Sequence, residues 1–464
     1  MENISTKYFR ENIQRSLLDE KLRWNVKKAT DLTLSKRKSV IEDIETWELL
    51  REKAYRIRKN AIDNLDYYLE LFENKCRGND VQVIRATDGE DACTIVNTIL
   101  KSVDAKLVVK SKSMVTEEIH LNEHLEESGV EVVETDLGEY IIQLAGETPS
   151  HITAPALHKS REEIGKLFSE KLELPYSSDP TVLTGYARNI LREKFLNADA
   201  GISGANFLIA ETGTIVLVEN EGNARLSTTL PKIHIIITGI EKIIPSVDEA
   251  LLLLKLLPTS ATGQKITSYV SFINKPKQPD DIDGPKKIFV ILLDNGRRNL
   301  LKYPETSSAL YCIKCGACMN ICPVYQTVGG HAYNSVYPGP IGSILTPTMS
   351  SFCNGKDLAY GSSLCGACTE ICPVKINIHH TLLWIRSQAV ENSYTPFIEK
   401  LLFRVWRSVM QNVILYNILS KIMQFLQPLM LQDGLKIREA SASKNIPELA
   451  DKSFHEIWKS EFSK

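Results

Sequence analysis

The amino-acid sequence predicts an α/β domain followed by a mainly helical, cysteine-rich domain. Two observations lead to this division. Between residues 76 and 300, short β-branched runs alternate with segments of helical character, the pattern of a sheet with helices on its faces. Between residues 301 and 392, seven of the ten cysteines fall into two runs. The 464 residues suffice for two to four domains with substantial cores.

Residues 1–75 form a first region that we expect to be helical and highly charged. Trp24, Leu50 and Leu65 lie among many charged residues, and no proline interrupts the stretch. Such a region suits a docking arm or a helical cap on the next domain. No chemistry is visible in it.

The predicted α/β domain covers residues 76–300. Strands are expected at residues 81–84, 107–109 and 130–133, separated by helices from Gly89 to Ser102 and from about Thr116 to Ser128. Further strands are expected at residues 207–210, 214–218, 233–237 and 288–292. The segment 274–286, rich in Pro, Lys and Asp, is expected to be a loop.

The two cysteine runs carry the clearest chemical signal. The first, from Cys312 to Cys322, has the C-x2-C-x2-C-x3-C-P spacing of bacterial two-cluster ferredoxins. The second, from Cys365 to Cys372, has three cysteines and the same Cys-Pro end. Three thiolates two residues apart can hold three corners of a cubane, whereas the cysteine before proline binds the other cluster. The runs therefore predict two [4Fe–4S] clusters.

Zinc and disulfides are the alternatives. Zinc sites use isolated cysteine pairs that close on four ligands, unlike these continuous runs. Disulfide frameworks suit short secreted chains, whereas this chain is long and begins without a signal-peptide pattern.

The crossing rule of two-cluster ferredoxins assigns the ligands. Cluster one is expected to bind Cys312, Cys315, Cys318 and Cys372, and cluster two is expected to bind Cys322, Cys365 and Cys368. Cluster two is then one thiolate short, because Ser362 stands where the first run has Cys312. The spare Cys353 is either the missing ligand or an unrelated thiol. The fourth iron is held by Cys353, Ser362, water or a substrate, or it is absent.

Two further segments complete the chain. Residues 337–343 are rich in glycine and proline and are not expected to form a long helix, whereas residues 382–385 have helical character after the second run. Residues 393–464 are predicted to form amphipathic helices and a polar tail. Their apolar face packs either on the protein's own core or against a partner or membrane surface. It is formed by Leu402, Trp406, Met410, Val413, Ile414, Ile418, Ile422, Phe425 and Leu429.

Composition excludes several classes of function. A net charge of -2 and a pI near 6.5 give no argument for nucleic-acid binding. No apolar stretch is long enough to predict a transmembrane helix, although peripheral membrane contact stays open. Reduced thiols and the lack of an export signal predict a cytoplasmic location. No G-x-G-x-x-G motif supports a Rossmann-type nicotinamide or flavin site.

The motifs together resemble a known family. Four segments in the α/β region look like the LUD domain of lactate-utilisation proteins, and combined with residues 337–342 and the cysteine runs they resemble the LutB family of iron–sulfur proteins. The resemblance covers residues 10 to 430. The four segments are residues 110–114, 135–139, 149–152 and 210–214.

This resemblance implies a fold and a function. The LUD domain is related to the sugar-phosphate isomerase and CoA-transferase folds. Members of the family take part in a cytoplasmic system of LutA, LutB and LutC that oxidises L-lactate to pyruvate. The resemblance therefore implies an electron-transfer protein acting in a complex with LutA-like and LutC-like subunits and an unknown electron acceptor. The family's second run also has three cysteines.

Other polar residues are weaker candidates. Lys110, Ser111, Lys112 and Ser113 lie between a strand and a helix start, where they suit either an anion site or helix capping with solvated lysines. Glu139 and Glu211 lie in glycine-containing turns, as catalytic carboxylates or solvated acids. The histidines are acid/base groups, iron ligands or ordinary hydrogen-bonding residues, namely His151, His158 and His331.

Two functional classes follow. The first is an electron-transfer subunit of a multiprotein lactate oxidoreductase, which is not a complete enzyme alone. The second is a catalytic subunit whose LUD domain binds an organic anion next to a cluster with an open iron. The sequence leaves the physiological acceptor and the stoichiometry of the complex undetermined.

Overall fold

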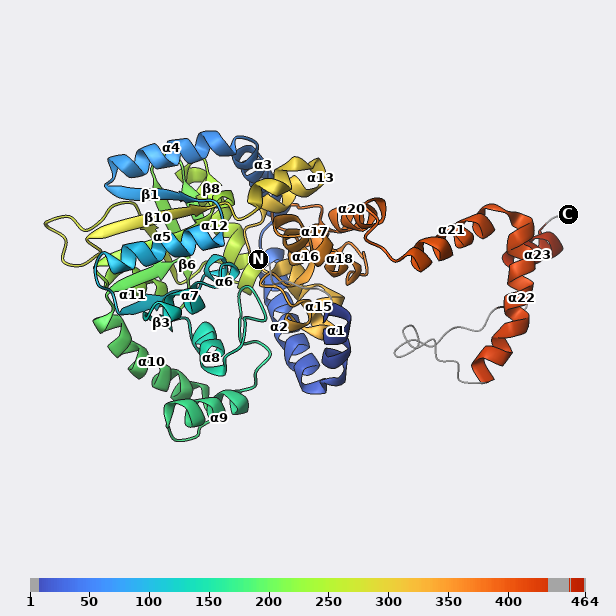
Figure 1. Cartoon of the computed structure of the whole chain (residues 1–464), viewed down its shortest axis with the longest axis horizontal. Coiled ribbons are helices and arrows are strands. Elements are labelled where there is room, and N and C mark those ends of the chain that lie inside the picture. The colour runs from blue at the N-terminus through green and yellow to red at the C-terminus, as the bar shows by residue number, and fades with distance from the viewer. Residues whose placement is uncertain (1–7, 433–449, 451, 463–464) are drawn as a thin grey trace. The chain divides into compact units, whose positions relative to one another are not determined.

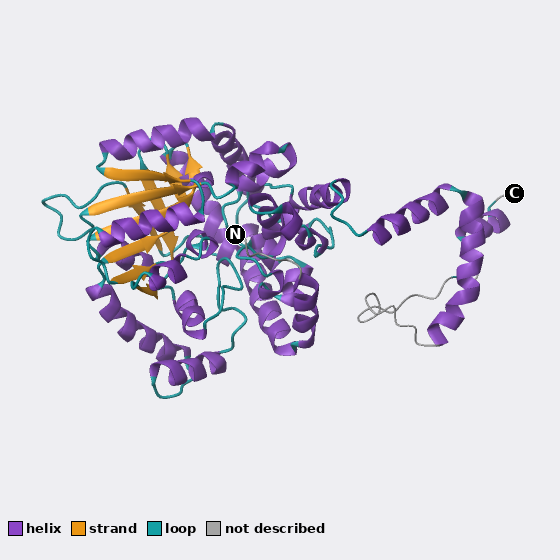
Figure 2. Cartoon of the chain, viewed as in Figure 1, coloured by secondary structure: helices purple, strands orange, loops and turns teal. Residues whose placement is uncertain are grey.

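The computed structural model describes residues 8–432, 450 and 452–462, and the chain divides into two units, Met1–Gln388 and Ala389–Lys464 (Figure 1). The sheets lie in the first unit, and the cysteine region of that unit consists of helices and loops (Figure 2). This agrees with the predicted order of an α/β part followed by a mainly helical part.

A six-stranded parallel sheet forms the centre of the α/β part. Its strands are short apolar runs buried by helices, as parallel sheets require. Neighbouring strands are in register, with Val290 of β10 beside Ile236 of β7. The spatial order is β1 (Val81–Ala86), β10 (Lys287–Leu293), β7 (Ile233–Gly239), β4 (Ala200–Ser203), β2 (Leu107–Lys110) and β3 (Glu131–Glu134).

Helices cover both faces of this sheet. Val108 faces one core with α5 (Gly89–Lys101) and α7 (Leu121–Glu127), while Val109 faces another with three further helices. The alternation follows from the period of two along a strand. These three helices are α8 (Leu137–Ala145), α9 (Arg161–Leu172) and α10 (Pro180–Asn197).

A second sheet has four strands, and its apolar residues belong to the same core as those of the cysteine region. Strand β5 pairs with β6 antiparallel and with β8 parallel, and β9 pairs with β6 antiparallel. The surrounding elements include α11 (Asn223–Thr229) and α12 (Val247–Thr262). The strands are β8 (Ile243–Ile244), β5 (Phe207–Ile209), β6 (Thr214–Glu219) and β9 (Tyr269–Ile273).

The N-terminal region is helical, as predicted, and forms a cap. Most of its charged residues are exposed, whereas Arg58 and a sparse set of apolar residues such as Val26, Ala61 and Phe72 are buried. Helix α2 packs on α12 and α15 (Pro323–Val328), so the cap touches both parts of the unit. The helices are α1 (Phe9–Leu18), α2 (Glu20–Glu42), α3 (Trp47–Asp63) and α4 (Leu65–Gly78).

The cysteine region consists of short helices. One apolar core contains Phe72 of the cap, Ile209 of the small sheet and Tyr325 beside the first run, so these parts share a core. The elements are η3 (Arg297–Lys302), α13 (Pro304–Ser307), η4 (Ser308–Tyr311), α14 (Ala317–Asn320), α15, η5 (His331–Tyr333), α16 (Gly339–Met349), α17 (Phe352–Gly355), α18 (Asp357–Tyr360), α19 (Ala367–Glu370) and α20 (Ile378–Glu391).

Two local predictions were wrong. The single helix expected from Thr116 to Ser128 is two helices, α6 (Met114–Glu118) and α7, because His120 between them has a left-handed backbone with φ of 53°. The glycine- and proline-rich segment at 337–343 contains the start of α16, an eleven-residue helix. Pro340 lies in its first turn, where a missing backbone N–H costs nothing.

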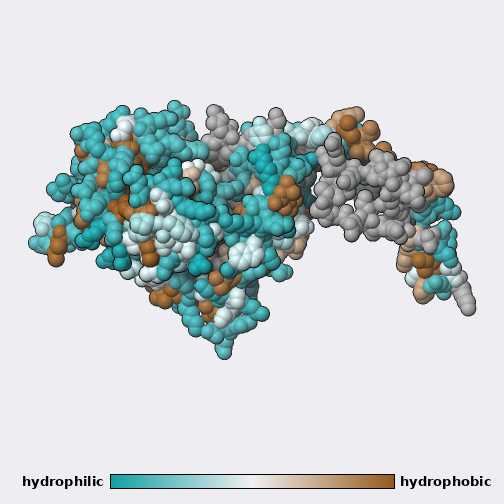
Figure 3. Space-filling model, turned by 90° about the horizontal axis from the view of Figure 1, so that it is seen from below, coloured by the Kyte–Doolittle hydropathy of each residue, from teal (hydrophilic) through white to brown (hydrophobic). Residues whose placement is uncertain are grey.

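The second unit contains α21 (Phe397–Gln411), α22 (Val413–Gln432) and α23 (Phe454–Glu461). Within this unit no described side chain of α21 or α22 is buried, and the exposed apolar residues include Leu402, Trp406 and Met410. Figure 3 shows the resulting apolar surface on this unit. The side chain of Leu429 and residues 433–449 of the predicted tail lie outside the described residues. In the described part of the chain, no helix is both long and apolar enough to cross a bilayer.

Candidate functional site

The two cysteine runs form two loops with the same backbone conformation. In the first run, Lys314 and Gly316 have left-handed backbones with φ of 57° and 75°. In the second, Leu364 and Gly366 have φ of 56° and 83°. Each glycine precedes a one-turn helix, α14 or α19. The repeated spacing of the sequence is therefore accompanied by a repeated backbone conformation.

The fold brings the cysteines together across the two runs. Cys312, Cys315, Cys318 and Cys372 line one cavity with apolar neighbours that include Ile152 and Ile341. Cys322, in contrast, lies close enough to Cys365 and Cys368 for the charges of these side chains to interact. The last cysteine of each run thus lies with the first cysteines of the other run.

The spacing between these thiols argues against a single zinc ion. Tetrahedral zinc with Zn–S bonds of ~2.3 Å requires sulfur atoms only ~3.8 Å apart. Among the described residues, the set of three or more ligand atoms within 4.8 Å of one another is Glu147, His158 and His331, with no cysteine in it. Among the described residues, no three cysteine sulfurs are thus as close together as a tetrahedral zinc site requires.

The surroundings of the thiols suit a cationic iron–sulfur group. Burial raises the pKa of Cys315 to about 12 and that of Cys372 to about 11, so bare thiolates are disfavoured without a metal. Backbone amides nevertheless point at the sulfurs. The N–H of Lys314 donates to Cys312 Sγ at 3.3 Å, and the N–H of Ile376 donates to Cys372 Sγ at 3.4 Å. Such bonds stabilise cluster-bound thiolates and tune their potential.

The second run differs from the first at one position. Ser362 Oγ accepts a hydrogen bond from the N–H of Leu364 at 3.1 Å, which is the same bond that Cys312 Sγ accepts from Lys314. Ser362 therefore occupies the position of the missing thiolate. Cys353 is exposed on the short helix α17.

Arginines from the N-terminal cap hold the backbone of both runs. Arg51, on α3, donates to the carbonyl oxygens of Cys372 and Glu370. Arg37, on α2, donates to that of Ile371 at 3.1 Å. Arg58 is fully buried and donates to the carbonyls of Leu310 and Tyr311 next to Cys312. No functional role was predicted for this region from the sequence, because these hydrogen bonds join residues that are far apart in the chain.

The three candidate histidines lie near one another, but each is held by ordinary hydrogen bonds. His151 is buried beside Gly316 and pairs with Asn320 Oδ1 at 3.1 Å. Burial lowers the pKa of His151 to about 3, so the ring is neutral. His158 contacts Glu147 and Ser150, and His331 contacts the Thr148 carbonyl. These contacts fasten a loop of the α/β part to the cysteine region.

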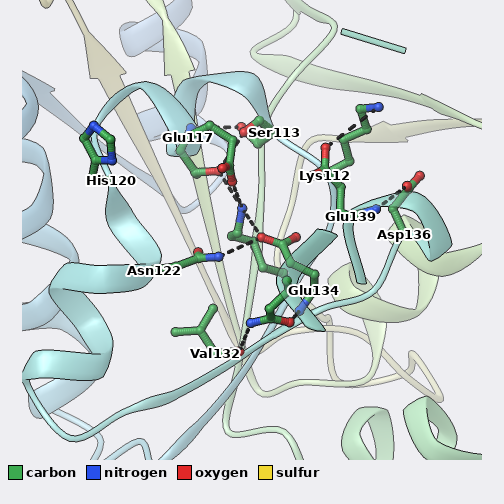
Figure 4. Close-up of polar contacts among 12 residues, drawn as sticks. Lys112, Ser113, Glu117, His120, Asn122, Val132, Glu134, Asp136 and Glu139 are labelled. Carbon is green, nitrogen blue, oxygen red and sulfur yellow. Dashed lines mark hydrogen bonds and ion pairs between the residues drawn. The ribbon is translucent and has the colours of Figure 1, made fainter. Parts of the chain in front are cut away.

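The residues at the end of β2 differ from one another in their contacts. Lys110 is buried and paired with Glu134 at 2.6 Å and Glu117 at 3.0 Å, so it cannot bind a ligand. Ser113 caps α6 by accepting from the N–H of Thr116, as the capping interpretation expected. Lys112 points the other way, toward Glu139 (Figure 4).

The two candidate glutamates also differ. Glu211 Oε1 accepts from the N–H of Val247 at 2.7 Å, so this exposed acid helps to begin α12. Glu139 is buried in the first turn of α8 with Nζ of Lys112 at 3.8 Å. Burial raises the pKa of Glu139 to about 8 despite this lysine.

A cleft of about 300 Å³ opens beside the first cysteine run. Lys112 and Ser113 line it from the end of β2, and Lys242 lines it from the turn η2 (Ile240–Lys242) after β7. Lys314, from the first cysteine run, lines both this cleft and the cavity of the four cysteines. Neither Lys242 nor Lys314 was predicted as a site residue, although Lys242 follows a predicted strand and Lys314 lies inside the cysteine motif.

Comparisons with known proteins agree with these features. Residues 69–293 match the LUD domain family, and residues 308–376 match the 4Fe-4S dicluster domain. The chain is 44% identical over 420 residues to a protein of Bacillus velezensis named lactate utilization protein B, covering 90% of this chain and 88% of that protein. It is 45% identical to proteins of the same name from Bacillus subtilis and Macrococcus caseolyticus, covering 90% and 86% of this chain and 88% and 84% of those proteins.

Proposed function

Since the chain belongs to the lactate utilization protein B family, we propose that it is an iron–sulfur electron-transfer protein of L-lactate degradation, in which L-lactate is oxidised to pyruvate. The observation that supports this most directly is the crossed grouping of the seven motif cysteines. That grouping is the arrangement of a protein with two clusters near each other.

The ligand assignment follows from this grouping. We propose that Cys312, Cys315, Cys318 and Cys372 bind cluster one, and that Cys322, Cys365 and Cys368 bind cluster two. A [4Fe–4S] cluster takes up and releases single electrons when it is bound. The protein contributes thiolates, N–H donors to their sulfurs, and the arginines Arg37, Arg51 and Arg58 that hold the loops.

The two sites differ in exposure, which suggests a direction for electron flow. Cys315 and Cys318 are buried, and their cavity adjoins the cleft. Cys365 is exposed although Cys322 and Cys368 are buried, so one edge of the second site reaches the surface of its unit. We infer that cluster one faces the electron source and that cluster two faces the acceptor.

The setting of the protein is part of the proposal. We propose a cytoplasmic complex with LutA-like and LutC-like subunits and an electron acceptor that is not identified. The regions 1–75, 76–300, 301–392 and 393–464 remain our proposed division of the chain. A relationship of the LUD domain to sugar-phosphate isomerase and CoA-transferase folds also stays a prediction.

A second candidate is a catalytic subunit that binds an organic anion next to an open-iron cluster. The cleft with Lys112, Lys242 and Lys314 favours an anion site. The cleft is lined by the first cysteine run, however, which belongs to the site with four cysteines. The second run, where one thiolate is missing, does not line it.

Dye reduction by the purified protein separates the two candidates. The anaerobic isolated chain is mixed with L-lactate and an artificial acceptor, first alone and then with LutA-like and LutC-like subunits. We expect reduction only with the subunits, because lactate oxidation is a two-electron step and clusters transfer single electrons. Robust lactate-dependent reduction by the isolated chain would establish the catalytic candidate instead.

A further inference from the structure

The cleft beside the first cysteine run lies where parallel sheets place ligands. Its lining includes residues that follow the carboxyl ends of four neighbouring strands of the large sheet, and this is the edge at which open α/β sheets bind small molecules. The first cysteine run closes the cleft from the other side with Lys314. The residues in question are Ser111 to Ser113 after β2, Asp136 after β3, Gly204 after β4 and Lys242 after β7.

The acids in the cleft are already satisfied by the backbone. Glu219 accepts from the N–H groups of Ala224 at 2.7 Å and Arg225 at 2.8 Å. Glu221 accepts from that of Leu137 at 3.1 Å. Asp136 caps α8. These carboxylates are therefore not available as counter-ions for the lysines.

The lysines, in contrast, have few acidic partners among the described residues, since Lys112 has Glu139 at 3.8 Å and the other two have none. Lys242 is only 7% exposed, and neither Lys242 nor Lys314 belongs to an ion pair among the described residues. The nearby Glu241 is committed to Arg297, whose Nε lies 2.6 Å from its carboxylate. Nζ of Lys112 is buried without a hydrogen-bond acceptor. A buried ammonium without a partner is costly, so a ligand with negative charge would stabilise this cleft.

The rest of the lining limits what that ligand can be. Ile152, Leu217 and Leu257 supply apolar surface for a carbon skeleton. Asp136, Glu219 and Glu221 also line the cleft and would repel a second negative charge on the ligand. A singly charged organic acid therefore fits this lining better than a doubly charged phosphate ester.

We propose that this cleft binds a small organic carboxylate, with its carboxylate group held by Lys242 and Lys314 next to cluster one. Lys314 joins the two sites, because it lies in the loop between Cys312 and Cys315 and its ammonium covers the ring of Tyr337 at 4.0 Å. Binding does not require that the chain transfer electrons. The relation of the carboxylate to cluster one, however, rests on the proposed function.

Calorimetric titration of the anaerobically purified full chain tests the proposal. The ligands are L-lactate, pyruvate, acetate, the neutral amide lactamide and inorganic phosphate. We expect saturable binding of at least one carboxylate and no binding of lactamide. Lactamide binding as tight as L-lactate, a preference for phosphate, or no carboxylate binding would overturn the proposal without any variant.

Two substitutions locate the site. Lys242→Met and Lys314→Met should each weaken carboxylate binding about tenfold or more, which corresponds to about 1.4 kcal/mol. Lys242→Arg should retain most of the binding. The matched control is Lys106→Met, which removes an exposed lysine that pairs with Asp104. Unchanged binding in both methionine variants would place the ligand elsewhere and contradict the proposal.

Iron analysis and the reduction potential of cluster one distinguish a failure of the carboxylate site from a failure of the proposed electron-transfer function. If the lysines serve only as counter-charges for the cluster, their removal shifts the potential while the parent protein binds no carboxylate, and the cleft proposal fails alone. If the protein binds carboxylate but holds zinc instead of iron, the proposed function fails and the cleft proposal stands.

Discussion

Cys372 belongs to the second run in sequence, yet it lines a cavity with three cysteines of the first run. We predict that Cys372→Ser alters the spectrum of the cluster bound by Cys312, Cys315 and Cys318. Cys322→Ser should alter the other cluster. Electron paramagnetic resonance of the reduced variants distinguishes the two signals. An effect of each substitution on the cluster of its own run would show that the ligands are not crossed.

Ser362 occupies the position of a fourth thiolate in the second run and accepts the corresponding backbone hydrogen bond. An iron without a thiolate is held by fewer strong bonds, so cluster two should lose iron first in air and give a [3Fe–4S] signal. Ser362→Cys should slow this loss, and Cys353→Ala should leave it unchanged. Selective loss of cluster two in Cys353→Ala would instead identify Cys353 as the ligand.

The raised pKa of Glu139 predicts that the free energy of unfolding depends on pH. Its pKa is raised from 4.5 to about 8 by burial, so the folded state holds this proton more tightly than the unfolded state. Its contribution to stability is complete below pH 4.5 and falls as the pH rises toward 8. Glu139→Gln should therefore be more stable than the parent above pH 8, measured by urea unfolding.

The control for this pH effect is Glu131→Gln, which changes an exposed glutamate paired with Lys194. Its unfolding midpoint should follow that of the parent across the same pH range. Equal pH profiles of the parent and Glu139→Gln would mean that Glu139 is ionised in the folded protein.

At the residue scale, the short-range spacing of the cysteines was enough to predict a 4Fe-4S dicluster domain. C-x2-C spacing is a property of one loop, so the motif can be read without the fold. Lys242 and Lys314 are distant in sequence and meet only because β7 ends near the first run, so no local pattern could pair them.

At the scale of elements, the buried parallel strands were predictable because they are continuous apolar runs. Strand β4, Ala200–Ser203, was missed because it is four residues long and contains Gly201. That glycine is required by packing, since a Cβ there would lie 1.8 Å from the Ser227 carbonyl oxygen. Such a requirement is visible only in three dimensions.

Helix α3 holds the end of the second run through Arg51, and this predicts an effect on cluster one. Arg51→Met would leave the Cys372 and Glu370 carbonyls without their donor, at a cost on the order of 1–3 kcal/mol. The lost positive charge should also lower the reduction potential of cluster one. Redox titration and anaerobic unfolding measure the two effects. Arg56→Met, exposed on the same helix and paired with Glu52, is the control and should change neither.

At the scale of the whole first unit, the α/β part and the cysteine region share one apolar core with the N-terminal cap. The LUD domain and the dicluster domain are therefore packed against each other and are not joined only by a linker. The cap lies against both, the loop of His151 and His158 contacts the cysteine region, and Lys314 reaches from that region into the cleft. This arrangement allows a ligand in the cleft to lie next to cluster one.

The central claim is that the chain holds two cubane clusters, and metal analysis tests it most directly. Iron and acid-labile sulfide are measured in the anaerobically purified protein together with its visible absorption. The account predicts about eight iron atoms and about eight sulfides per chain, with broad absorption in the visible range. Stoichiometric zinc without that absorption would contradict it.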